Sequence, residues 1–238
     1  MKKFPLLYSK PPKIDAKKKL SIEMIVVYLD NQLHKFPTFL REKYQNRKKI
    51  ERETRVSQLL CPFLRNFREV DEYLLFDFES EWDYEESNRS SDFAVIDVKK
   101  FKRSWKLPQP IFTIEAKRLP TTGTDKKTKK SREKEYVEGN LGGIERYKRG
   151  HHGARLSQNA IVGYIQKENC SHWHTKINEW ITDLISNNTD DSIHWDFQDL
   201  LVETDSFITT KKYISTNTRK VDSVTDSVRL HHYLMELS

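Results

Sequence analysis

The sequence predicts an α/β protein, in which short strands alternate with helices. Apolar residues recur every three or four positions in residues 21–33 and again in 48–69, as on one face of a helix. Three runs rich in β-branched and aromatic residues follow, at 73–79, 92–99 and 111–118. A helical stretch with glycines at 139, 142 and 143, a strand at 159–166, a helix at 171–186 and strands at 207–215 and 228–237 complete the expected order.

Composition limits the class of protein. The chain has 238 residues, 36% apolar and 11% aromatic, which suits a packed core. Its 42 Lys and Arg exceed its 35 Asp and Glu, so its net charge of +7 favours a polyanionic partner, nucleic acid before an anionic membrane. No apolar run approaches the ~20 residues of a membrane helix, and no signal peptide is recognisable. Because Cys61 and Cys170 make no disulfide framework, we expect a cytoplasmic protein.

The N-terminal part is expected to support the rest of a single domain. Residues 1–47 should form a basic arm and helices packed on the core, and residues 48–238 the main domain. Ser21 suits the N-cap of the first helix, and Pro37 should end or restart it. In the helix at 48–69, Glu53 lies about 60° from Val56 around the helix axis and so borders the apolar face. Pro62 predicts a kink in this helix.

The run at 111–118 carries the candidate chemistry. In a strand, Glu115 and Lys117 share one face, while Ile114 and Ala116 point to the other. A carboxylate beside an ammonium at the end of a buried strand suits a hydrolytic metal site, where the acid binds a cation and the lysine faces water or phosphate. The alternative is an exposed edge-strand ion pair, worth ~0–1 kcal/mol.

Further acids can join Glu115. Asp92 opens the preceding strand, and neighbouring strands lie ~4.8 Å apart, so both carboxylates can share one cation. Asp97 is its rival, but the two are five residues apart and face opposite sides of a regular strand. Glu53 is a candidate third acid, or else a first-turn residue that complements the helix dipole.

These residues resemble a known family. Ser91-Asp92-Phe93 followed by Ile114-Glu115-Ala116-Lys117 is similar to the motif of the PD-(D/E)xK, or restriction-endonuclease-like, nuclease superfamily, with Ser91 in place of proline. The resemblance implies an αβββαβ core with a mixed central sheet flanked by helices, here with extra N-terminal helices and C-terminal strands. It also implies that Asp92, Glu115 and Glu53 bind Mg²⁺, with Mn²⁺ as a substitute. Lys117 would position or activate water and contact the scissile phosphate.

Two basic clusters are candidates for binding the nucleic-acid backbone. The loop 121–134 contains Lys126, Lys127, Lys129 and Lys130, and a second cluster contains Arg146 and Lys148. Beside a phosphate site, such residues would add a sequence-independent and salt-sensitive contribution to binding. Away from such a site, a lysine run is a solvated loop.

The resemblance implies a metal-dependent endonuclease that acts on DNA. Residues 136–150 and 161–164 also resemble later parts of nuclease subunits of bacterial anti-phage and restriction systems. Because no ATPase motif or DNA-reading module is present, we expect a partner subunit (a sensor or ATPase) or homo-oligomerisation to direct the effector. Two alternatives stay open: a catalytically inactive nucleic-acid-binding or assembly subunit with the same fold, and a ribonuclease.

Overall fold

A computed structural model describes residues 20–43, 53–69, 75–83, 90–98, 109–121, 123, 132–139, 142–187, 192–220 and 224–237. The arm was expected at residues 1–20; its residues 1–19 and the lysines at 126–130 lie outside these ranges. The helices are α1 (Ile22–Leu33), α2 (Phe36–Lys43), α3 (Glu53–Glu69), α5 (Gly143–Lys148) and α6 (Cys170–Asn187), with a 3₁₀ turn η1 (Phe197–Asp199). The strands are β1 (Phe76–Asp83), β2 (Ser90–Asp97), β3 (Phe112–Leu119), β4 (Gln158–Ile165), β5 (Val202–Ser206), β6 (Thr210–Thr218) and β7 (Ser227–Glu236).

The strands form one mixed sheet, so the predicted α/β class is confirmed. The seven strands lie in the order β1-β2-β3-β4-β7-β6-β5. The central pairs β3–β4 and β4–β7 are parallel, whereas the outer pairs on both sides are antiparallel. None of the helices in the described ranges combines the length and hydropathy needed to cross a membrane.

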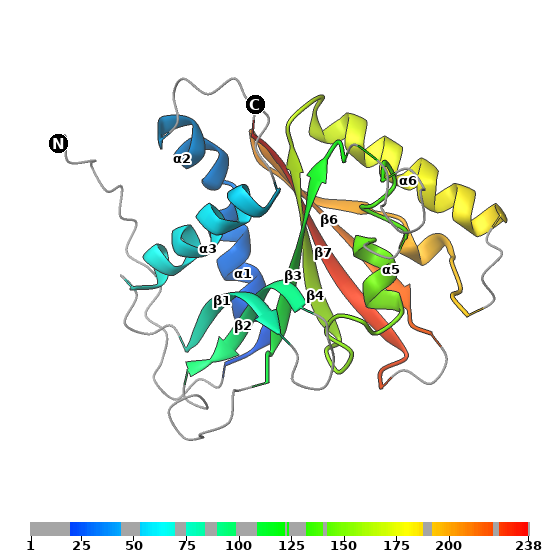
Figure 1. Cartoon of the computed structure of the whole chain (residues 1–238), viewed down its shortest axis with the longest axis horizontal. Coiled ribbons are helices and arrows are strands. Elements are labelled where there is room, and N and C mark those ends of the chain that lie inside the picture. Colours follow the sequence, from blue (N-terminus) through cyan, green and yellow to red (C-terminus); the bar gives the residue numbers. More distant parts are fainter. Residues whose placement is uncertain are drawn as a thin grey trace.

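Helices cover both faces of the sheet (Figure 1). Helices α1, α2 and α3 lie on one face, and α5 and α6 lie on the other. Alternation along β3 directs Ile114 and Ala116 into the apolar cluster beneath α1–α3. Glu115 and Lys117 therefore project to the opposite face, which also carries α5.

The N-terminal helices pack on one face of the sheet. Ser21 is the N-cap of α1 and accepts a hydrogen bond from the Met24 N–H. Pro37 is the second residue of α2. N–H groups in the first turn of a helix have no acceptor within the helix, so proline is tolerated there. The Tyr233 hydroxyl of β7 donates to Asp30 of α1 at 2.8 Å, which ties this helix to the centre of the sheet.

Two segments differ from the predicted elements. The expected strand at 207–215 is β6, which begins at Thr210, and the preceding β5 was not predicted. All five side chains of β5 are exposed, so this edge strand has no apolar alternation that could have revealed it. The stretch around the glycines was expected to be helical, but it forms a turn at 132–139 followed by the short helix α5. Gly139 has a φ of 102°, which a right-handed helix does not allow.

Candidate active site

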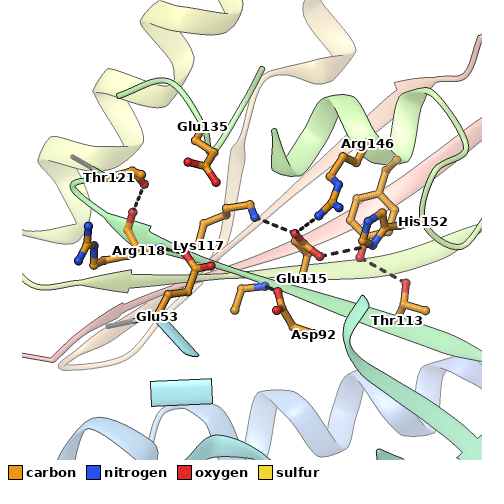
Figure 2. Close-up of polar contacts among 12 residues, drawn as sticks. Glu53, Asp92, Thr113, Glu115, Lys117, Arg118, Thr121, Glu135, Arg146 and His152 are labelled. Carbon is orange, nitrogen blue, oxygen red and sulfur yellow. Dashed lines mark hydrogen bonds and ion pairs between the residues drawn. The ribbon is translucent and has the colours of Figure 1, made fainter. Parts of the chain in front are cut away.

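The site begins where β2 separates from β3. The two strands pair from Val95–Phe112 to Phe93–Ile114, and β3 then continues to Leu119, paired with β4 alone among the described strands. Two carboxylates occupy the edge of β3 that β2 has left (Figure 2). Asp92 accepts a hydrogen bond from the Ala116 N–H, and Glu53, the first residue of α3, accepts one from the Arg118 N–H, both at 2.7 Å. The two carboxylates thus accept the backbone N–H groups that carbonyl groups of a paired strand would otherwise accept.

Glu115 and Lys117 form a buried ion pair next to this edge. Lys117 Nζ lies 2.7 Å from Glu115 Oε1, and the two residues are 3% and 2% exposed. Arg146 of α5 also donates to Glu115 Oε1, at 2.7 Å. His152, from the loop between α5 and β4, places Nδ1 3.3 Å from Glu115 Oε2. One carboxylate therefore faces three basic side chains (Figure 2).

The basic side chains keep Glu115 ionised. Burial alone would raise its pKa, but Lys117, followed by His152 (protonated only in acid) and Arg146, lowers the pKa to about 2. Burial opposes the charged form of Lys117, yet the carboxylates of Glu115, Glu53 and Asp92 raise its pKa above the ordinary value. The pair is consequently charged throughout the physiological range.

The neighbouring acids are crowded. Burial raises the pKa of Asp92 to about 7, and the negative charge of Glu115 contributes to the same shift. Burial also raises the pKa of Glu53, although Lys117 opposes the rise. Acids that are buried and repel one another favour a bound cation, because a positive charge would relieve both costs.

Hard oxygen ligands such as Asp92, Glu115 and Glu53 suit Mg²⁺. A carboxylate offers about four lone-pair sites, so the three contacts of Glu115 leave room for one more. Within the described ranges, however, no three His, Cys, Asp or Glu side chains are grouped closely enough to hold a metal ion. The donor types thus suit a divalent cation, but binding one would require the carboxylates to turn towards a common point.

The structure separates the other candidate residues. Arg146 reaches the acids, whereas Lys148, two residues further along α5, faces away and is completely buried. Lys148 Nζ lies 2.6 Å from Asp199, so Lys148 is not placed to contact nucleic acid. Asp97 lies at the opposite end of β2 from Asp92, paired with Phe76 of β1.

Two residues near the acids were missed by sequence reasoning. His152 has no local motif, and only the packing of its loop brings it to Glu115. Glu135 is 6% exposed, accepts a hydrogen bond from Arg132, and its negative charge contributes to the raised pKa of Glu53. Neither position shows a periodicity or spacing that could have identified it.

No family model, curated protein or solved structure matches this chain. The functional interpretation therefore depends on the geometry of the site.

Proposed function

We propose that this chain is a metal-dependent nuclease of the PD-(D/E)xK type that hydrolyses phosphodiester bonds of DNA. The observation that carries the proposal is the convergence of Asp92 and Glu53 on the edge of β3, next to the Glu115–Lys117 pair. A purely structural ion pair on an edge strand gives no reason for two further acids to lie beside it.

The order of elements supports the proposal. From α3 onwards, the chain runs α3, β1, β2, β3, α5, β4, which is the αβββαβ order of that superfamily. In addition, the pairs β1–β2 and β2–β3 are antiparallel and the pair β3–β4 is parallel. The sheet is therefore mixed, as the resemblance to that superfamily implies.

The basic residues have distinct roles in this proposal. Because the acids raise the pKa of Lys117, its ammonium stays protonated and acts as a fixed positive charge beside the phosphate rather than as a base. Arg146 is 19% exposed at its side chain, so its guanidinium can leave Glu115 and bind a phosphate oxygen from solvent. Bound Mg²⁺ would lower the pKa of a coordinated water and offset charge on the phosphate.

A nicking assay tests the proposal. Supercoiled plasmid should be nicked with Mg²⁺ or Mn²⁺, and EDTA should abolish the reaction. Glu115→Gln should lose activity because it removes the charge that holds both the cation and Lys117. Glu179→Gln is the matched control. Glu179 lies exposed on α6, where it forms a surface ion pair with Lys176. Absence of metal-dependent cleavage, or equal cleavage by Glu115→Gln, would overturn the proposal.

A non-catalytic nucleic-acid-binding or assembly subunit is the second candidate. The observation that favours it is the engagement of both Glu115 oxygens by Lys117, Arg146 and His152. Such a subunit would keep its salt-dependent DNA affinity in EDTA and in Glu115→Gln, without cleavage. Repeating the nicking assay with RNA separates a ribonuclease from both.

We further propose that the nuclease is an effector of bacterial anti-phage defence that a partner subunit activates or directs. Site-specific cleavage by the purified chain alone would contradict this part of the proposal while leaving the chemistry intact.

A further inference from the structure

We propose that His152 is a positioning residue that sets the orientation of the Glu115 carboxylate. This inference rests on the proposed function, in which Glu115 is a metal ligand. His152 is completely buried, and its Nδ1 lies 3.3 Å from Glu115 Oε2. Its ring also packs edge-on against Tyr147 of α5, with ring centroids 5.8 Å apart. The imidazole therefore has a defined place behind the acids.

The loop that carries His152 is held from two sides. Arg219, just after β6, donates through Nη2 to the carbonyls of Gly153 and Leu156, both at 2.8 Å. Gly153 has a φ of 51°, and a Cβ there would lie 2.9 Å from the side-chain amide of Asn159. That amide in turn accepts hydrogen bonds from the backbone and hydroxyl of Thr113 on β3. The loop is thereby linked to the strand that carries Glu115.

Fixing this loop has an energetic cost. Arg219 is only 4% exposed, and its Nε and Nη1 find no hydrogen-bond partner within the described ranges. A buried guanidinium held by neutral carbonyls is unfavourable compared with one that is solvated. Costs of this kind are concentrated near functional sites, where a side chain must be held in place.

The geometry explains why a contact to the second oxygen matters. Lys117 and Arg146 both bind Oε1 of Glu115, and the terminal carboxylate torsion has only a broad preference. The His152 ring stands 3.3 Å from Oε2, a close polar contact rather than an aligned hydrogen bond, and so its bulk limits rotation of the carboxylate plane. A polar partner behind a ligating carboxylate typically changes metal affinity or activity by about 10–100-fold.

Replacement of His152 tests this role in the full chain. His152→Leu should weaken Mn²⁺ binding, measured by titration calorimetry, by about 10–100-fold. It should also raise the Mg²⁺ concentration for half-maximal nicking, while saturating Mg²⁺ restores most of the rate. His152→Asn, whose amide nitrogen can take the place of Nδ1, should recover most of the affinity and is the more conservative variant if His152→Leu folds poorly.

His231→Leu is the matched control. His231 is also buried, but its Nε2 contacts Gln158 and its ring lies beside Phe112, which packs under α1–α3. It should lower thermal stability without changing Mn²⁺ affinity. Unchanged Mn²⁺ affinity in His152→Leu, or an equal loss of affinity in both variants, overturns the positioning role of His152 but leaves the proposed function standing. Failure of the unaltered chain to bind Mn²⁺ or to cleave overturns the proposed function as well.

Discussion

Two buried lysine–carboxylate pairs on the same side of the sheet differ in how they are balanced. Lys148 and Asp199 are completely buried and 2.6 Å apart. Asp199 also accepts the N–H of Asp196, and the Lys148 ammonium lies 4.6 Å from the centre of the Trp195 ring. One cation meets one anion, and protein groups complete the contacts of both.

The Glu115–Lys117 pair is just as short but is not balanced in this way. Two further basic residues face Glu115, and the neighbouring acids Asp92 and Glu53 influence both partners. A closed one-to-one pair suits a structural role, whereas a crowded group of both signs can exchange partners when a cation or phosphate arrives. The difference favours the Glu115–Lys117 pair as the one that serves the proposed function, and the following variants test it.

The largest expected effect is on cleavage. Lys117→Met should reduce the initial nicking rate at saturating Mg²⁺ by about 1,000-fold, because preorganised charge at a reacting phosphate contributes on that scale. Lys148→Met should leave the rate per folded molecule unchanged. Equal rate losses in the two variants would contradict the functional distinction between the pairs.

The next effect is on stability. Lys148→Met should lower the free energy of unfolding by about 3–5 kcal/mol, because it leaves the buried Asp199 carboxylate without its cation. Lys117→Met should lower the free energy of unfolding by less, since Glu115 keeps the positive charge of Arg146. Urea unfolding of both variants makes the comparison, and the reverse ranking would show that the 115–117 pair is the structural one.

Buried histidines should make the protein sensitive to acid. Burial lowers the pKa of His152 and His231 to about 4 and that of His232 to about 3, from an ordinary value of 6.5. The unfolded chain therefore takes up protons first, so stability is full above pH 6.5 and falls as the pH drops towards these values. At pH 5, each histidine should lower the free energy of unfolding by about 2 kcal/mol relative to neutral pH. Urea unfolding at pH 7 and pH 5 measures the loss, and His231→Leu should reduce the difference.

The smallest expected change in stability is a gain at Asp92. Because its folded pKa is raised to about 7, Asp92 favours the folded state below pH 3.8, and this contribution is lost as the pH rises through 7. Asp92→Asn keeps an acceptor for the Ala116 N–H and removes the charge. It should therefore raise stability at pH 8 by about 1–2 kcal/mol, since partial exposure reduces the full shift. It should also abolish cleavage, and a stable, fully active variant would reduce Asp92 to a capping role.

Local pattern in the sequence determined which side chains share a face. The period of two in β3 separates Glu115 and Lys117 from Ile114 and Ala116, and the structure confirms this arrangement. The helical stripe of α3 likewise placed Glu53 at the border of the core. Such relations lie within one element, where backbone geometry alone sets direction.

Tertiary structure decided which elements meet. The sequence could not show that Arg146 reaches Glu115 while Lys148 turns to Asp199, because charge alone does not distinguish neighbours on one short helix. It also did not reveal His152 or the exposed edge strand β5. Contacts between elements depend on loop paths and on the packing of both sheet faces, which no local periodicity encodes.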